Sequence, residues 1–259
     1  MEDLSCYNPE GSVLRNAQLR MLDIAIEFDI ICKRNNITYW IMSGTLLGAR
    51  RHGGFIPWDD DFDVGVKMED YNRLLKILEV ELPYFLKLQT KKTDPNHPYF
   101  YAKIRDLNSF ILEDQCLHRN YKYNGLFIDI FPFESICLPK KSKLLFDSFY
   151  SKFRFELKKG IIWSLISSFF YHITLLLLPL LKVTGKITKN KFSHAYGIGF
   201  YAPHKLNTCF PVGKIKFEEY EFSAPNNIDE FLTDEYGDFM GIPPKEKRYV
   251  HSSKIELFS

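Results

Sequence analysis

Apolar residues recur at intervals of three and four in two stretches of the N-terminal half, Ser12 to Lys33 and Glu69 to Leu82. This spacing places the apolar side chains on one face of an α-helix, so it predicts two amphipathic helices. Pro83 marks the end of the second one. We expect the first helix to support the core by packing, and we assign it no chemistry.

Short apolar runs predict strands between and after these helices. The clearest are Tyr39 to Met42, Tyr99 to Leu107 and Gly125 to Phe133. A turn at residues 108–109 leads into Phe110 to Glu113, which we expect to pair with the preceding strand as a hairpin. Helices and strands in this order predict an α+β fold in which helices flank a mixed sheet.

One stretch, Ser43 to Val66, combines several functional signals and reads SGTLLGARRHGGFIPWDDDFDVGV. The strand before it runs into Ser43-Gly44, and a helix is predicted from Thr45 to about Arg51, with Ser43 as its N-cap. Free amides at a helix N-terminus bind phosphate oxygens, and a glycine lets a ligand approach the backbone closely. The turn therefore predicts a phosphate-binding site.

Four acids follow within five residues: Asp59, Asp60, Asp61 and Asp63. If the strand begins early enough, Asp59, Asp61 and Asp63 share one face, because strand side chains alternate. Carboxylates so placed repel one another unless a cation lies between them, and Mg²⁺ and Mn²⁺ prefer such hard oxygen ligands. An acid run is commonly a solvated surface, but apolar residues that favour burial flank this one. These are Phe55, Ile56, Trp58, Phe62, Val64 and Val66.

Two further segments carry charges among apolar residues. Asp129 is the one acid in GLFIDIFPF, where it is either structural or a third metal ligand. Lys103 and Arg105 share a face of their predicted strand with Tyr101, where they either balance acids or bind phosphate. The residues alone leave both choices open.

The segment Ser43 to Val66 closely resembles the hallmark of the LicD family, the phosphorylcholine-transferase group that includes the fukutin-related enzymes. Looser resemblance recurs at Gly125 to Phe133 and Tyr236 to His251. The resemblance implies a nucleotidyltransferase-like mixed sheet with an Asp-x-Asp strand and a third acid on a later strand. It implies a catalytic centre made of Asp59, Asp61, Asp63 and Asp129. Of these acids, Asp61, Asp63 and Asp129 are expected to bind Mg²⁺ or Mn²⁺. The residues expected to bind the donor are Ser43, Gly44, Thr45, Lys103 and Arg105.

By the same resemblance, the expected reaction moves phosphorylcholine from CDP-choline to a hydroxyl of a bacterial surface glycan or its lipid-linked precursor, as in capsule, lipopolysaccharide or teichoic acid synthesis. Asp129 or Asp59 is the expected general base. Three alternatives stay open: another CDP-alcohol such as CDP-ribitol or CDP-glycerol, nucleotidyl transfer from an NTP, and a non-catalytic membrane-surface binding protein.

The C-terminal half adds two predicted elements and an unusual tail. Phe217 to Pro225 suggests a hairpin, and Ile228 to Tyr236 suggests a helix with Asn227 as its N-cap. The tail, YGDFMGIPPKEKRYVH, is either a strap over the core or part of the border of the substrate pocket. Candidate border residues are Arg51, His52, Tyr236, Asp238, Arg248 and His251.

The stretch Ile161 to Leu181 contains no Asp, Glu, Lys or Arg, and lysines flank it on both sides. It fits buried core helices, contact with an anionic membrane surface, or a membrane span. Together with a composition shift near Pro139, it predicts three parts. These are a catalytic core over 1–138, an apolar and basic-flanked helical insertion over 139–216, and a returning segment over 217–259.

The overall composition narrows the function classes. A formal net charge of +2 gives no case for nucleic-acid binding. Five cysteines without CxxC spacing argue against a disulfide framework or a zinc site and favour a reducing compartment. The N-terminus lacks a basic region followed by an apolar core, so we expect no cleaved secretory signal and a cytoplasmic location. Peripheral contact with the inner membrane surface stays open.

Overall fold

The computed structural model describes residues 2–97, 99–114, 121–135, 191–195 and 202–258, with a few single positions between 162 and 176. The chain divides into two compact units: Met1–Phe131 with Asn207–Ser259, and Pro132–Leu206. Most of the predicted insertion over 139–216 lies outside the described residues. The predicted division into three parts therefore stays a prediction.

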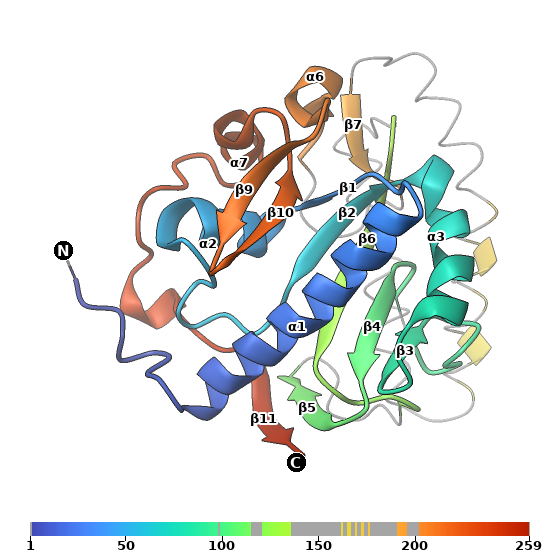
Figure 1. Cartoon of the computed structure of the whole chain (residues 1–259), viewed down its shortest axis with the longest axis horizontal. Coiled ribbons are helices and arrows are strands. Elements are labelled where there is room, and N and C mark those ends of the chain that lie inside the picture. The colour runs from blue at the N-terminus through green and yellow to red at the C-terminus, as the bar shows by residue number, and fades with distance from the viewer. Residues whose placement is uncertain are drawn as a thin grey trace. The chain divides into compact units, whose positions relative to one another are not determined.

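The first unit is built on a curved, mixed sheet with the strand order β1-β2-β6-β4-β3 (Figure 1). The strands are β1 Tyr39–Ile41, β2 Asp63–Lys67, β3 Leu86–Gln89, β4 Ala102–Asp106 and β6 Phe127–Glu134. Sequence-distant strands β2 and β6 are neighbours, and β6 pairs with β4 in antiparallel register, with Lys103 opposite Asp129. This arrangement confirms the predicted α+β class and brings three charged segments together.

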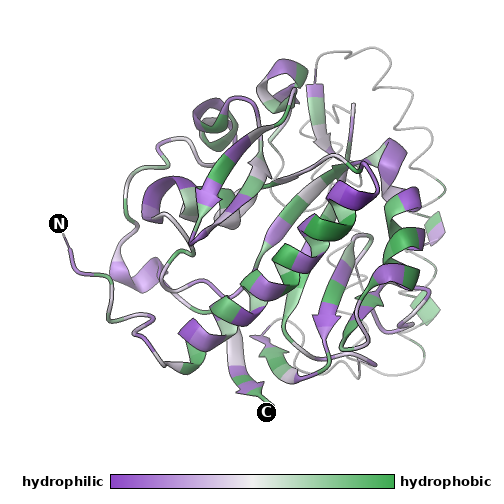
Figure 2. Cartoon of the chain, in the orientation of Figure 1, coloured by the Kyte–Doolittle hydropathy of each residue, from purple (hydrophilic) through white to green (hydrophobic). Residues whose placement is uncertain are grey.

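Helices pack on this sheet as the apolar periodicity predicts. Helix α1 (Val13–Arg34) begins at the N-cap Ser12, whose side chain accepts a hydrogen bond from the Arg15 amide. Figure 1 shows α1 crossing the sheet, and α3 (Met68–Glu81) lies near its β3 side. Apolar and polar residues alternate around α1 in Figure 2, and its apolar face is buried. Both predicted helices are confirmed, with bounds that differ by one or two residues.

The hairpin of β9 (Gly213–Phe217) and β10 (Tyr220–Ala224) packs against β1. Its Phe217 ring lies 4.8 Å from that of Phe55 and 5.3 Å from that of Phe62, measured between ring centroids. These contacts bury one phenylalanine before and one after the acids Asp59, Asp60 and Asp61. The helix α7 (Ile228–Tyr236) begins at Asn227, whose side chain accepts from the Glu230 amide as predicted.

One predicted pairing is wrong. Strand β5 (Ser109–Glu113) does not pair with β4 but with β11 (Ser252–Leu257), in antiparallel register. The physical reason is that both edges of β4 are already taken, one by β3 and the other by β6. The segment Ser252–Leu257 therefore pairs with a strand from the first half of the chain.

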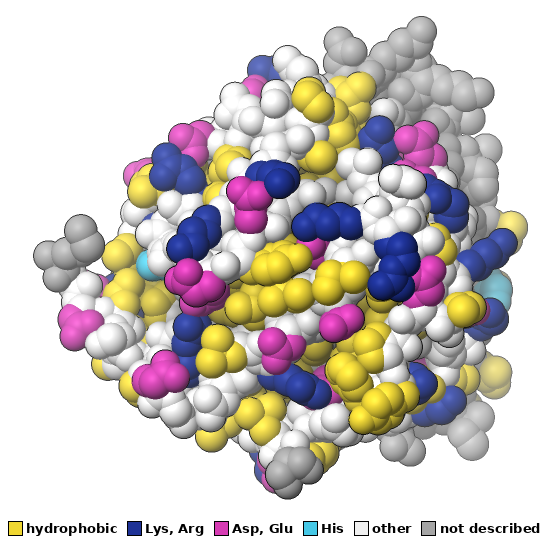
Figure 3. Space-filling model, viewed as in Figure 1, with side chains coloured by type: hydrophobic (Ala, Val, Ile, Leu, Met, Phe, Trp, Pro, Cys, Tyr) yellow, Lys and Arg dark blue, Asp and Glu magenta, His cyan; other side chains and the backbone are white. Residues whose placement is uncertain are grey.

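In the second unit, β7 (Lys191–His194) pairs with the end of β6, with Phe133 opposite His194, and with β8 (His204–Lys205). The short helix α6 (Leu206–Cys209) and a 3₁₀ turn at Lys245–Lys247 complete the described elements. Within the described residues, no helix is both long and apolar enough to cross a bilayer. On the face seen in Figure 3, basic and acidic side chains are intermixed.

Candidate active site

The carboxylates of Asp59 and Asp61 converge on the start of helix α2 (Ser43–His52). A Cβ atom added at Gly44 would lie 2.8 Å from Asp59 Oδ2 and 3.9 Å from Asp61 Oδ1. The first distance is shorter than a normal Cβ contact, so a side chain at this position would displace the Asp59 carboxylate, whereas glycine leaves room for it. The turn and the acids are therefore adjacent.

The local backbone differs from the prediction in two respects. Strand β2 begins only at Asp63, so a bend of the chain, and not the strand pleat, brings Asp59 and Asp61 to the turn. Ser43 is not the N-cap but the first helical residue, with a φ of 48° in the left-handed region. A non-glycine residue in that region is strained, and such strain is found preferentially at functional sites.

Thr45 positions the second acid of the Asp-x-Asp pair. Its buried Oγ1 accepts a 2.8 Å hydrogen bond from the Asp63 amide. Because Thr45 is on the first turn of α2, this bond ties the start of β2 to the Ser43-Gly44 turn. Sequence analysis grouped Ser43, Gly44 and Thr45 at this turn. Ser43 has a strained backbone, Gly44 leaves space for the Asp59 carboxylate, and Thr45 accepts a hydrogen bond from the Asp63 amide.

Asp129 joins this cluster from β6. Its amide donates a 2.8 Å hydrogen bond to the Phe62 carbonyl, between Asp61 and Asp63 in sequence. Burial raises the pKa of Asp129 to about 6, although Lys103 opposes the rise. Burial and the charges of Asp61 and Asp129 also raise the pKa of Asp63 well above its usual value. Acids from two distant segments therefore share one buried region that disfavours their combined negative charge.

His251 reaches the same acids from the C-terminal tail. Its Nδ1 lies 3.3 Å from Asp60 Oδ1, 3.6 Å from Asp59 Oδ1 and 4.0 Å from Asp61 Oδ2. The hydrogen bond to Asp60 raises the pKa of His251 to about 9 against the effect of burial, with help from the Asp61 and Asp59 charges. One ligand atom each of Asp59, Asp61 and His251 lies within 4.8 Å of the others, close enough to share a metal ion.

Asp60 anchors that tail. It is buried, and it accepts hydrogen bonds from the His251 amide at 2.9 Å and from the Ser252 hydroxyl. Sequence analysis placed Asp60 opposite the other acids and gave it no role. The tail is consequently a strap that also borders the acid cluster, so the two interpretations of the sequence are compatible.

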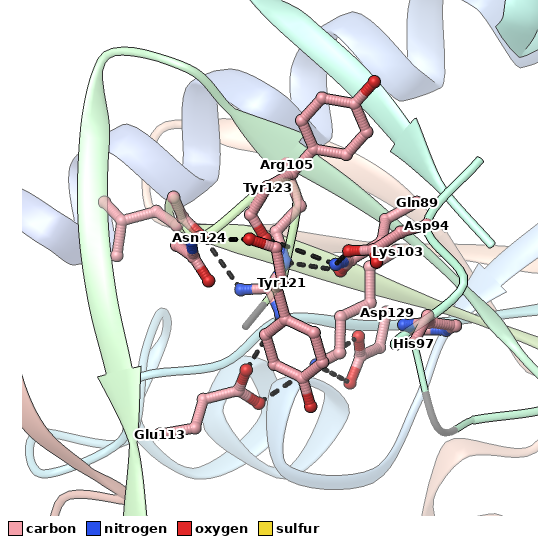
Figure 4. A network of polar contacts seen from close by, with 12 residues as sticks. Gln89, Asp94, His97, Lys103, Arg105, Glu113, Tyr121, Tyr123, Asn124 and Asp129 are labelled. Atoms are coloured by element: carbon pink, nitrogen blue, oxygen red, sulfur yellow. Dashed lines mark hydrogen bonds and ion pairs between the residues drawn. The ribbon is translucent and has the colours of Figure 1, made fainter. Parts of the chain in front are cut away.

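Lys103, Arg105 and Glu113 form an ion network beside Asp129 (Figure 4). Lys103 Nζ lies 2.9 Å from Asp129 Oδ1 and 3.3 Å from Glu113 Oε1. Arg105 Nη2 lies 2.8 Å from Glu113 Oε2. Burial alone would raise the pKa of Glu113, but the Lys103 and Arg105 charges outweigh it and lower the pKa to about 2.

The network changes what the two basic residues can do. The other two Arg105 nitrogens donate to Gln89 Oε1 at 2.7 Å and to the Gly125 carbonyl at 2.8 Å. Arg105 thus has a protein partner at each nitrogen, whereas Lys103 directly contacts a candidate metal ligand. Glu113 was missed by sequence analysis, although two buried cations on one strand require compensating acids, and that requirement was the available signal.

The remaining candidates divide into two groups. Burial raises the pKa of the Tyr236 hydroxyl, and the negative charges of Glu235, Asp63, Asp59 and Asp61 add to the rise. Tyr236 is therefore near enough to the acids for their charges to act on it. Arg51 instead fastens the tail, with Nη1 donating to the carbonyls of Phe239 and Gly241 at 3.0 and 2.9 Å.

The other three candidates lie around the tail. The neighbour of Arg51, His52, accepts from Arg51 Nε at 2.9 Å, and burial with the Arg51 charge lowers its pKa to about 4. Arg248 pairs with Glu2 and lies over the ring of Trp58, 5.2 Å from its centroid. Asp238 is exposed.

A comparison with protein families shows to which family the chain belongs. The LicD/FKTN/FKRP nucleotidyltransferase domain matches residues 36–176, more than half of the chain. The chain belongs to the LicD family. The matched range contains Gly44, the four clustered acids and the Lys103–Glu113 network, whereas Tyr236 and His251 lie beyond it.

Individual LicD-family relatives resemble the chain over very different lengths. The lipopolysaccharide cholinephosphotransferase LicD of Haemophilus influenzae is 26% identical over 274 residues, covering 92% of this chain and 95% of that protein. The mouse ribitol 5-phosphate transferase FKRP is 38% identical over 69 residues, 26% of this chain and 14% of its own length. An uncharacterized protein of Rickettsia prowazekii is 62% identical over 45 residues, 17% of each chain.

Proposed function

We propose that the chain is a phosphotransferase that uses a divalent metal to move phosphorylcholine from CDP-choline to a hydroxyl of a bacterial surface glycan or its lipid-linked precursor. The observation that carries the proposal is the convergence of Asp59 and Asp61 beside the glycine opening at Gly44, with Asp63 and Asp129 buried near enough for the charges of the acids to interact. Similarity to a cholinephosphotransferase along nearly the whole chain supports the choice of donor.

The carboxylate ligands of the acid cluster fit a hard divalent cation. Burial and mutual repulsion raise the pKa values of Asp59, Asp61 and Asp63, so their charged forms need a cation among them. Carboxylate oxygens suit Mg²⁺ or Mn²⁺. Asp61 and Asp63 would hold the ion with Asp129, and Asp59, whose ligand atom lies within 4.8 Å of those of Asp61 and His251, would complete the ligand set of the ion. When bound, it would neutralise donor phosphate oxygens and stabilise charge at the attacked phosphorus.

The protein's own groups complete the mechanism. The first amides of α2 point to the opening at Gly44 and bind the donor diphosphate there, since a helix N-terminus attracts anions. Asp129 or Asp59 takes the proton of the acceptor hydroxyl. Lys103 lies against Asp129 and orients it, and Tyr236 with His251 borders the acceptor side of the cluster.

The decisive experiment combines the purified protein, CDP-choline, Mg²⁺ and a glycan acceptor, with the products identified by mass. Asp61→Asn should abolish transfer, EDTA should silence the wild type, and Mg²⁺ or Mn²⁺ should restore it. Asp70→Asn, which changes a helix-surface acid outside the site, is the matched control and should retain full activity. Full activity of Asp61→Asn would refute the proposal.

Parallel reactions separate the alternatives. Similarity to ribitol 5-phosphate transferase FKRP makes CDP-ribitol the first competing donor, followed by CDP-glycerol, and CTP tests nucleotidyl transfer. Turnover with one of these and none with CDP-choline would keep the enzyme class and replace the donor.

A peripheral membrane contact is part of the proposal, because a lipid-linked acceptor lies at a membrane. Among the few described positions of the predicted apolar stretch, Ile162, Leu165, Phe169 and Leu176 are helical and exposed. Spacings of three, four and seven residues are those that place side chains on one side of an α-helix. Co-sedimentation with anionic but not neutral liposomes is the expected result. Liposome binding with no metal-dependent turnover would instead favour a non-catalytic surface protein.

A further inference from the structure

We propose that Tyr99, Tyr101 and Phe131 form an aromatic subsite for the quaternary ammonium group of the donor, and that this subsite selects choline over an uncharged alcohol. The inference rests on the proposed function and deepens it. We call these three residues the aromatic row.

The aromatic row lies next to the acid cluster on one face of the sheet. Lys103 on β4 pairs with Asp129 on β6, and Phe131 is two residues further along β6, hence on the same face. Tyr101 lies directly before β4, with its ring against that of Phe131. Their ring centroids are 4.3 Å apart, and the Tyr99 ring stacks on Tyr101 at 4.8 Å. Choline's two-carbon link keeps its ammonium group close to the phosphorus, so a subsite for that group must lie next to the acid cluster.

The rings already face a cation. The ammonium nitrogen of Lys103 lies 5.3 Å from the centroid of Tyr99 and 5.9 Å from that of Tyr101, and it is 3.3 Å from that of Phe127. Aromatic faces attract cations through the ring quadrupole and are the usual recognition element for quaternary ammonium groups, which cannot donate hydrogen bonds. A polyol donor would instead require hydrogen-bonding groups at this position.

Charge and exposure permit a second cation here. The carboxylates of Asp129 and Glu113 balance the charges of Lys103 and Arg105, so Lys103 does not leave the region positive. Tyr101 and Phe131 are half-buried, whereas Lys103 is buried at 1% exposure. Tyr101 and Phe131 are therefore the members of the aromatic row that a donor can reach.

The test is equilibrium binding to the full chain, with Mg²⁺ and no acceptor, by titration calorimetry. The ligands are CDP-choline, its uncharged isostere in which carbon replaces the ammonium nitrogen, and CDP-glycerol. The wild type should prefer CDP-choline to the isostere. Tyr101→Leu and Phe131→Leu should weaken CDP-choline binding by about tenfold, in keeping with a desolvated cation–π contact. Neither variant should change CDP-glycerol binding, and Tyr101→Phe should bind like the wild type.

The outcomes separate this inference from the proposed function. Equal weakening of all three ligands in both leucine variants, or unchanged preference for CDP-choline, overturns the subsite while leaving the transferase standing. If the wild type binds no CDP-alcohol, the proposed function fails and the subsite falls with it. Unchanged CDP-glycerol binding also shows that a variant is folded.

Discussion

Asp29 and the acid cluster are two buried acidic regions with opposite surroundings. Asp29 is fully buried, and it accepts hydrogen bonds from the hydroxyls of Tyr39 and Tyr220, both at 2.6 Å, while Lys33 Nζ lies 2.6 Å away. The carboxylates of Asp59, Asp61 and Asp63 instead have other acids as close neighbours. A buried acid that has its own donors holds a fold together, whereas acids grouped without enough donors are suited to an external cation.

The largest expected effect of this difference is on catalysis. Asp63→Asn should lower turnover with CDP-choline by at least about a hundredfold, because loss of a direct ligand should exceed the usual cost of losing a supporting residue. The same change should leave the melting temperature equal or higher, because it removes repulsion among the acids. Kinetics and thermal unfolding of the same sample check both parts, and a large loss of stability would contradict the comparison.

Asp29 should show the reverse pattern. Asp29→Ala leaves the buried Tyr39 hydroxyl and the half-buried Tyr220 hydroxyl without their acceptor, so the free energy of unfolding should fall by about 3 kcal/mol. Asp29→Asn keeps one acceptor oxygen and should lose less. Urea unfolding measures the loss. Turnover at a temperature where the variant is still folded should match that of the wild type. A loss of turnover at that temperature would contradict the view that Asp29 stabilises the fold and takes no part in the reaction.

Mg²⁺ should stabilise the protein through the acid cluster and not through the surroundings of Asp29. At a Mg²⁺ concentration a hundred times its dissociation constant, the folded state gains about 2.7 kcal/mol, which raises the melting temperature by several degrees. The rise should vanish in Asp63→Asn and persist in Asp29→Asn. An equal rise in both variants would mean that Mg²⁺ binds elsewhere.

The smallest effect concerns acid stability. The pKa of Glu113 is lowered from 4.5 to about 2 in the folded state, so its ionised form stabilises the protein above pH 4.5. That contribution is lost as the pH falls from 4.5 towards 2. Glu113→Gln should therefore be less stable than the wild type at neutral pH, and the difference should shrink across this window. A constant difference, measured by urea unfolding at several pH values, would contradict the role of the ion network.

Local periodicity and capping predicted much of the fold. Ser12 and Asn227 act as N-caps where expected, and the apolar spacing gives α1, α3 and α7 with nearly correct bounds. The partner of β5 was wrong, because pairing depends on which strand edges are free after the sheet has assembled. No residue pattern near β5 encodes that availability.

The site was predictable to a similar extent. The resemblance named the acids that the structure brings together, and their metal-binding role stays a prediction. The left-handed Ser43 could not be foreseen, because a serine before a helix usually acts as a cap. Asp60 was missed because its partner His251 is 191 residues away in the sequence. Glu113 was missed although its partners Lys103 and Arg105 precede it by only 10 and 8 residues, because the hairpin prediction gave its strand the wrong partner.

The attachment of the tail to Asp60 sets an order of events during synthesis. His251 follows Asp60 by 191 residues, yet its ring lies among the acids near residue 60. A ribosome-bound chain that has already formed the sheet from β1 to β6 still lacks this histidine. The cluster is therefore complete only after the segment that carries His251 and β11 has emerged from the exit tunnel and β11 has paired with β5.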